Sequence, residues 1–221
     1  MIFVNFKAYQ QGTGKKAIDL ILMLEEIALL NDVKIIPVLQ ASDIKEAVVS
    51  TKLEVWAQHV DAFEYGAHTG SILPEAVFED GAVGTFLNHS EHKFENPEKL
   101  REANKRAISI GLKTLIFAAD ITELGRIIKL KPKPTYVSYE PPELVGSKTT
   151  SVAQAKPEII ERVVKLTVDK EIPLIVGAGI KSFEDVKKSL DLGAAGVAVA
   201  SDVVTARDPR KEILDLVKGF R

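Results

Sequence analysis

Three side chains that could move protons or neutralise negative charge stand just after predicted strands. Glu140 follows a β-branched and aromatic run at residues 135–139, and two prolines end that run. His89 comes after the apolar run at residues 82–87, and Lys7 comes after the first apolar run of the chain. A carboxylate or an imidazole can act as a general acid or base, and an ammonium can neutralise a phosphate or a developing oxyanion.

Each of these residues also has a simpler interpretation. Glu140 could be a solvated glutamate at a loop start, Lys7 a surface ammonium and His89 a structural histidine. The prolines after Glu140 stiffen the root of a loop that Gly146 leaves free to pivot, which is typical of a lid over a base. Ser90 is expected to cap a short helical turn whose positive end would lower the basicity of His89.

The elements that must position these residues alternate along the whole chain. Eight apolar stretches have the length and residue types of strands, and helical patterns follow them after short links. Ser42, Asp120 and Ser182 are expected to cap the helices that they precede. The predicted strands cover residues 2–5, 34–39, 53–58, 82–87, 113–118, 135–139, 173–176 and 196–199. The predicted helices cover residues 15–30, 42–49, 74–81, 97–110, 157–168, 183–192 and 209–217, with shorter ones after the fifth and eighth strands.

Strands that are apolar on both faces need cover on both sides, which parallel sheets receive from helices. Eight strand–helix units favour a closed α/β barrel, formed as a single domain over residues 1–221 with several shortened helices. An open Rossmann-like sheet is the alternative. In a barrel, chemistry belongs at the carboxyl ends of the strands, where Glu140, His89 and Lys7 stand.

The turns after the last two predicted strands suggest an anion site. Gly177 and Gly179 follow the seventh strand, and Ala200 and Ser201 follow the eighth before a short helix. Small residues let backbone N–H groups approach an anion, and a helix N-terminus adds favourable potential. Gly-x-Gly alone is a weak signal, but its place in the strand order matches the phosphate site of such barrels.

The composition argues against several classes of protein. The formal net charge is −2 and no basic stripe stands out, which argues against nucleic-acid binding. The chain has no cysteine, and its apolar stretches are too short or too interrupted by charges to span a membrane. His89 and His92 have helical ligand spacing, but no third ligand stands at suitable spacing, so no metal site is expected. Without a signal-peptide pattern, a cytoplasmic protein is expected.

Taken together, these residues resemble the triosephosphate isomerase family, in its short archaeal branch. The matching segments occur in family order over nearly the whole chain, and their ordered combination is highly specific although each is modest alone. They are Asn5-Phe6-Lys7, Ala57-Gln58, Gly66-Ala67-His68-Thr69-Gly70, His89-Ser90-Glu91 and Tyr139-Glu140-Pro141, together with the turns after the seventh and eighth strands.

The resemblance implies a TIM (β/α)8 barrel that interconverts dihydroxyacetone phosphate and D-glyceraldehyde 3-phosphate through an enediolate, in glycolysis and gluconeogenesis. Glu140 would be the base, and neutral His89 would polarise the carbonyl. Lys7 would offset negative charge, Asn5 would position Lys7 and the substrate, and Glu91 would support Lys7. No metal or organic cofactor is implied. The phosphate would be held by backbone N–H groups of Val145, Gly179, Ala200 and Ser201.

The resemblance also implies a homodimer or homotetramer. Thr69 would lie at the tip of a loop that enters the neighbouring subunit's active site and braces Asn5. Three departures from the family pattern stand in the sequence: Gly146-Ser147-Lys148-Thr149 closes the lid, Asp202 follows the last phosphate turn, and His92 replaces an arginine. An acidic side chain near a phosphate would repel it unless that side chain points away.

Two other kinds of function remain open. Another phosphosugar barrel, such as a Schiff-base aldolase or a phosphate-binding lyase, would share the phosphate turns. An aldolase would need a lysine inside a late strand, and residues 135–139 contain none. A non-catalytic binder with this fold would not be expected to retain Glu140, His89 and Lys7 together. An isomerase is therefore the predicted function.

Overall fold

The computed structural model describes residues 1–141 and 157–221, in which eight parallel strands close into one barrel. Each strand pairs with the next, and the last pairs with the first. This closure confirms the barrel and excludes the open sheet. The predicted lid residues, including Val145 and Gly146, lie outside the described residues. The strands are β1 (Ile2–Asn5), β2 (Ile35–Leu39), β3 (Trp56–Ala57), β4 (Gly84–Leu87), β5 (Lys113–Ala118), β6 (Tyr136–Tyr139), β7 (Leu174–Val176) and β8 (Gly196–Val199).

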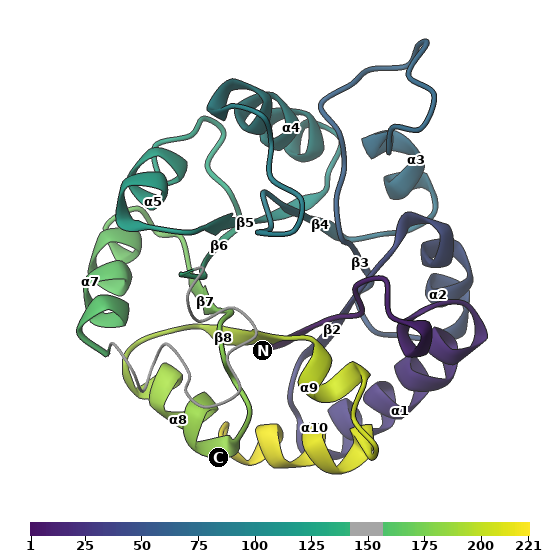
Figure 1. Cartoon of the computed structure of the whole chain (residues 1–221), viewed down its shortest axis with the longest axis vertical. Helices are drawn as coiled ribbons and strands as arrows, with labels where there is room; N and C mark the ends of the chain where they lie inside the picture. The colour runs from purple at the N-terminus through teal and green to yellow at the C-terminus, as the bar shows by residue number, and fades with distance from the viewer. Residues whose placement is uncertain (142–156) are drawn as a thin grey trace.

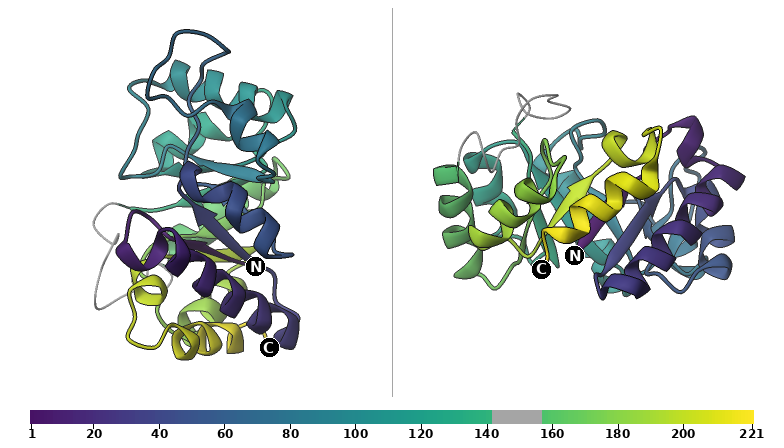
Figure 2. Two further views of the ribbon diagram at one scale, coloured as in Figure 1. Left: turned by 90° about the vertical axis from the view of Figure 1, so that its right-hand side faces the viewer. Right: turned by 90° about the horizontal axis from the view of Figure 1, so that it is seen from below.

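Helices surround the barrel as an outer ring, and the segment between β3 and α3 projects beyond that ring (Figure 1). Both termini lie at one end of the barrel (Figure 2). Within the described ranges, no helix has the length and apolar character needed to cross a membrane. The helices are α1 (Lys15–Asn31), α2 (Ile44–Ser50), α3 (Pro74–Glu79), α4 (Pro97–Ser109), α5 (Ile121–Ile127), α7 (Pro157–Val168), α8 (Phe183–Asp191), α9 (Ser201–Val204) and α10 (Pro209–Lys218), with 3-10 turns η1 (Gln10–Gly12) and η2 (Ala41–Asp43).

Side-chain caps explain where several helices begin. The Ser182 side chain accepts from Asp185 N–H and the Asp185 side chain accepts from Ser182 N–H, a reciprocal capping box at the start of α8. Asp120 caps α5 as predicted. The predicted cap by Ser42 is wrong, because Ser42 lies inside η2 and α2 begins after Asp43 without a side-chain cap.

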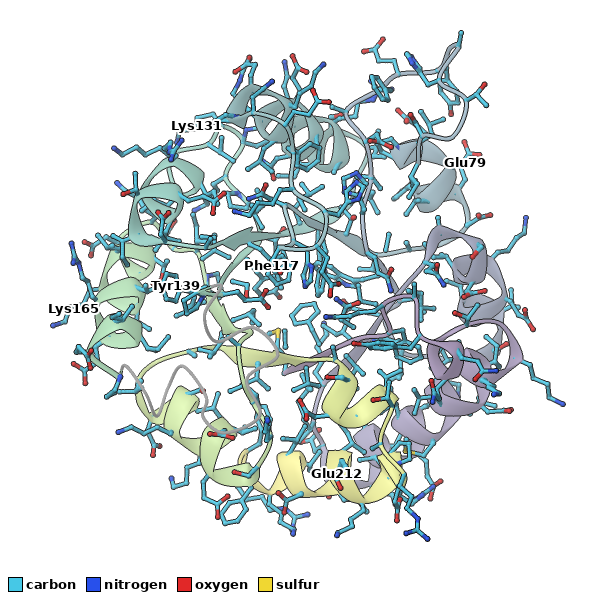
Figure 3. The ribbon with its side chains drawn as sticks, in the orientation of Figure 1. Glu79, Phe117, Lys131, Tyr139, Lys165 and Glu212 are labelled. Atoms are coloured by element: carbon cyan, nitrogen blue, oxygen red, sulfur yellow. The ribbon has the colours of Figure 1, made fainter. Side chains whose placement is uncertain are left out.

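The apolar residues form two cores. The inner core fills the barrel, where Phe3 packs edge-to-face on Trp56 with ring centroids 5.1 Å apart. The outer core lies between the strands and the helices. Figure 3 shows Phe117 at the middle of the barrel, whereas Lys165 points outward from the ring of helices. Because both faces of the strands are buried, side chains at the strand ends are held on a rigid frame.

The third strand is shorter than predicted. β3 has two residues, whereas the sequence predicts residues 53–58. Backbone hydrogen bonds nevertheless continue on both sides of β3, from Val83 N to Val55 O at 2.9 Å and from Gln58 N to Leu39 O at 2.9 Å. The chain around β3 is therefore hydrogen-bonded to its neighbours over a longer stretch than the two residues of the strand. This extended stretch places Gln58 at the carboxyl end of the barrel.

Candidate active site

One cavity at the carboxyl ends of the strands gathers most of the predicted site residues. Ser201 begins α9 beside this cavity, and Val145 falls outside the described residues. The lining residues come from both halves of the chain, as expected for a closed barrel. They are Asn5, Lys7, Phe86, His89, Phe117, Glu140, Gly177, Gly179, Ile180, Ala198, Val199, Ala200 and Asp202.

Lys7 is held in an unusual backbone conformation just beyond β1. Its φ of 46° lies in the left-handed region, which is uncommon for a residue with a side chain. Two hydrogen bonds hold this turn: Lys7 N donates to Asn5 Oδ1 at 3.0 Å, and Gln58 Nε2 donates to Lys7 O at 3.0 Å. The turn brings the Lys7 side chain to the wall of the cavity, with Asn5 and Gln58 as its supports.

The hydrogen bonding of His89 determines which of its nitrogens carries the proton in the neutral ring. Glu91 N donates to His89 Nδ1 at 3.2 Å, so Nδ1 is the acceptor and Nε2 carries the hydrogen. Nε2 lies 3.8 Å from Oε2 of Glu140. A ring of this kind offers an N–H donor to a substrate oxygen beside the carboxyl group.

Burial keeps His89 neutral. Burial lowers the pKa of His89 to about 4. Glu91 raises this pKa and Lys7 lowers it, both by less than burial does. The predicted cap by Ser90 is wrong, because its hydroxyl has no hydrogen-bond partner among the described residues; residues 89–92 form a turn, closed by His92 N donating to His89 O at 2.8 Å. The next helix, α4, begins only at Pro97, and burial is the largest cause of the lowered pKa of His89.

Glu140 is buried at the end of β6, so the alternative of a solvated glutamate is wrong. Glu140 is 5% exposed. Its backbone N–H donates to Ala118 O at 2.9 Å, which extends the pairing of β5 with β6. Oε2 has no hydrogen-bond partner among the described residues. Burial raises the pKa of Glu140 to about 8, while Lys7 lowers it and Glu91 raises it. A carboxylate desolvated in this way is a strong base once ionised.

Glu91 forms the outer edge of the site. Its Oε1 accepts from Lys7 Nζ at 2.7 Å, and its Oε2 lies 3.8 Å from His89 Nδ1. Its side chain is 57% exposed, against 17% for Lys7. The ion pair therefore connects the turn after β1 with the turn after β4, with Glu91 on the solvent side.

The turns after β7 and β8 form the other wall of the cavity. Gly179 has a φ of 72°, which glycine adopts without strain, and Ala200 precedes the first turn of α9. Asp202, in that first turn, also lines the cavity.

Asn88 has a structural role in the site that its sequence context did not predict. Asn88 has a φ of 60° and donates through Nδ2 to Phe117 O at 3.0 Å and to Glu123 Oε1 at 2.9 Å. Phe94 N donates back to Asn88 Oδ1 at 3.3 Å. These bonds fix the turn that carries His89. An asparagine between a strand end and a histidine was the available signal, because asparagine tolerates the left-handed region.

Gly177 leaves room for the base. A Cβ built on Gly177 would lie 2.7 Å from Ser138 Oγ and 2.8 Å from Glu140 Cγ, and it would also clash with Glu140 Oε1. Only glycine therefore allows the carboxyl group to lie against the end of β7. The sequence pointed to Gly177 only as part of a turn that could hold an anion, not as space for the base.

The other three histidines are not among the residues that line the cavity around Glu140. The His92 ring packs on the His59 ring, with centroids 4.1 Å apart, and His68 stacks on Phe63. Across residues 1–141 and 157–221, no group of three or more histidine, cysteine, aspartate or glutamate side chains could hold a metal ion.

Comparison with known proteins agrees with this arrangement. A family model described as triosephosphate isomerase matches residues 1–219. The chain is 40% identical over 219 residues to the triosephosphate isomerase of Methanobacterium bryantii, covering 98% of this chain and 95% of the relative. It is 41% identical over 218 residues to that of Saccharolobus solfataricus, covering 98% and 94%. It is 39% identical over 223 residues to that of Methanopyrus kandleri, covering 99% and 97%.

These relatives are archaeal and are matched over nearly their full length. Both the predicted resemblance and its archaeal branch are thereby confirmed. The barrel, the matched length and the relatives lead to one conclusion. The chain belongs to the triosephosphate isomerase family.

Proposed function

We propose that this chain interconverts dihydroxyacetone phosphate and D-glyceraldehyde 3-phosphate, with Glu140 as the base. Glu140 removes a proton from C1 of the ketose, the hydroxyl proton on O1 then passes to O2 through the ring of His89, and the same carboxyl group returns its proton to C2. The observation that carries this proposal is the cavity shared by Glu140, His89 and Lys7, with His89 Nε2 3.8 Å from Glu140 Oε2. Desolvation raises the basicity of the carboxylate, which proton abstraction requires.

His89 supplies the electrophile in this proposal. Its Nε2–H donates a hydrogen bond to the substrate carbonyl, and that bond strengthens as negative charge develops on the oxygen. A neutral imidazole suits this task, because its proton remains on the ring while the enediolate forms. The low pKa of His89 and the hydrogen bond from Glu91 N to its Nδ1 support the assignment.

Lys7 neutralises negative charge on the substrate and on the enediolate. Asn5 holds the Lys7 turn, and Glu91 holds the ammonium when substrate is absent. Backbone N–H groups of Gly179, Ala200 and Ser201, together with that of Val145, bind the phosphate. Support for the first three is their position in the turns after β7 and β8 and at the start of α9.

A coupled assay on dihydroxyacetone phosphate tests the proposed reaction. We expect the purified protein to produce D-glyceraldehyde 3-phosphate without added metal or organic cofactor. Treatment with a chelator should leave the rate unchanged. No turnover by a folded preparation would reject the isomerase and would favour another phosphate-binding barrel.

We also propose that the chain forms a homo-oligomer through its Thr69 loop. Residues 64–70 are exposed, while the loop is closed at its base by Asp61 N donating to Ile72 O and Ile72 N donating to Asp61 Oδ2. A groove of about 460 Å³ runs along the mouth of the site, where a neighbouring loop could bind. Its lining includes Asn5, Lys7, Gln58, His59 and His92.

Light scattering tests this assembly. We expect the purified protein to have at least twice the mass of one chain, and Thr69→Arg to reduce both the mass and the turnover. Thr122→Arg, at an exposed position on α5, is the matched control and should change neither. A single-chain mass with full turnover would contradict the proposal. The predicted cytoplasmic location remains a prediction, which cell fractionation would test.

A further inference from the structure

Ser138 is a fully buried residue whose hydroxyl has no hydrogen-bond partner in the described part of the chain. It lies in β6, and its register partners are Phe117 in β5 and Ile175 in β7. Both partners belong to the apolar inner core. A buried hydroxyl without a partner is costly, and a smaller apolar residue would fill this place without that cost. Packing alone therefore does not explain Ser138.

The polar side chain that follows Ser138 on the same face of the extended chain is that of Glu140. Side chains two residues apart in a strand share a face, so Ser138 and Glu140 both point into the barrel. Gly177 lies against both of them: a single Cβ placed there would be 2.7 Å from Ser138 Oγ and in closer contact still with Glu140 Oε1. The two oxygens thus border the same small space at the end of β7.

We propose that Ser138 is a positioning residue for the base, whose hydroxyl donates a hydrogen bond to Oε1 of Glu140 when that carboxylate is ionised. This inference rests on the proposed role of Glu140. Serine rotates about χ1 among three staggered wells, so the hydroxyl can turn toward the carboxylate without moving the backbone. A donor favours the charged form of a carboxylate. Ser138 thereby opposes the effect of burial, which by itself favours protonated Glu140.

Four other titratable or charged groups lie around Glu140 on neighbouring elements. Lys7, after β1, lowers its pKa, and Glu91, after β4, raises it. His89 Nε2 lies 3.8 Å from Oε2, and Asp202 lines the same cavity from α9. A change at Ser138 leaves all four in place, so a shift in the titration of Glu140 would report on the hydroxyl.

The test compares Ser138→Ala with the unaltered protein in the pH dependence of kcat/KM. We expect the pKa of the base to rise by about one unit, because a hydrogen bond to a charged group is lost. At pH values below that pKa, kcat/KM should fall about tenfold, while its value at high pH should change less than about twofold. The phosphate of the substrate also titrates near pH 6, but equally in both proteins. Carbon-13 NMR of labelled glutamate, assigned with Glu140→Gln, should show the same rise directly.

Ser189→Ala is the matched control. Ser189 is also fully buried, but its hydroxyl donates to Asp185 O at 2.7 Å in α8, away from the site. This variant should keep the pH profile of the unaltered protein. Ser138→Cys, which keeps the size but offers a weak donor, should give an intermediate shift and serves if the alanine variant does not fold.

Coincident pH profiles for the unaltered protein, Ser138→Ala and Ser138→Cys would overturn the proposal. An equal shift in Ser189→Ala would also overturn it, because the effect would then not be specific to the site. Inactive Glu140→Gln together with an unchanged Ser138→Ala profile would reject the role of Ser138 alone. Near-normal turnover by Glu140→Gln would instead reject the base itself.

Discussion

The imidazole Nε2 of His89 and the carboxyl Oε2 of Glu140 lie 3.8 Å apart, although the two residues are 51 positions apart in the chain. Both side chains are buried, and burial shifts the two pKa values in opposite directions, to about 4 for His89 and about 8 for Glu140. Opposed shifts of this kind assign the roles of acid–base groups. The pair therefore consists of a neutral donor beside a carboxylate that binds protons strongly.

His89 should remain neutral throughout the physiological range. We expect nitrogen-15 NMR to show a ring protonated at Nε2 only, with no titration between pH 5 and pH 8, because its pKa is about 4. His68, exposed in the loop after β3, is the internal comparison. A proton on Nδ1, or a midpoint near pH 6.5, would contradict the proposed electrophile.

Glu140→Gln should change how stability depends on pH. The pKa of Glu140 is raised in the folded protein, so its favourable contribution is complete below about pH 4.5 and is lost as the pH rises through about 8. Glutamine never ionises. The variant should therefore gain stability relative to the unaltered protein as pH rises from 4.5 to 8, by on the order of a few kcal/mol.

Urea unfolding at a series of pH values measures this gain. Glu161→Gln, at an exposed position on α7, is the control and should show no such trend. A constant difference between Glu140→Gln and the unaltered protein across that range would mean that Glu140 is not desolvated.

Lys7→Met should weaken the binding of phosphorylated ligands. The methionine keeps much of the side-chain length but removes the charge, so the Kd of a phosphorylated inhibitor should rise by about tenfold or more, with a weaker dependence on salt. Calorimetry measures both effects. Lys15→Met, exposed at the start of α1, should leave the Kd unchanged. Equal affinity in Lys7→Met would count against a charge role for Lys7.

Adding one methyl group to the barrel core at Gly84 should lower the stability of the protein. A Cβ there would lie 2.6 Å from the ring of fully buried Trp56, so Gly84→Ala should lower the free energy of unfolding by about 1–3 kcal/mol. Gly125→Ala, in α5 with nothing within 4 Å, should raise it by about 0.5–1 kcal/mol. Denaturant unfolding distinguishes the two, and equal effects would contradict this account of the core.

The sequence predicts the fold well where local signals agree. The strand at Lys113–Ala118 and the helix at Pro157–Val168 have the predicted bounds, because β-branched residues, an initial proline and periodicity point the same way. Strand length is less predictable, as β3 shows, since regular pairing depends on neighbouring strands. The predicted cap at Ser42 is wrong because Ser42 lies in a 3-10 turn that precedes the helix.

The sequence predicts which residues form the site, but not the contacts that set their conformations and pKa values. Glu140, His89 and Lys7 stand at predicted strand ends, so barrel closure alone brings them together. The left-handed turn at Lys7 and the buried hydroxyl of Ser138 depend on contacts between distant strands, which no local pattern encodes. The low pKa of His89 likewise comes chiefly from burial by the assembled barrel.

The central claim is that the Glu140 carboxylate moves the proton, and turnover by Glu140→Gln tests it most directly. The amide keeps the shape but not the basicity, so kcat should fall by about 10²- to 10⁴-fold while a phosphorylated inhibitor binds with nearly unchanged affinity. Glu161→Gln should retain full turnover. Near-normal turnover by Glu140→Gln, measured on protein free of host isomerase, would contradict the account.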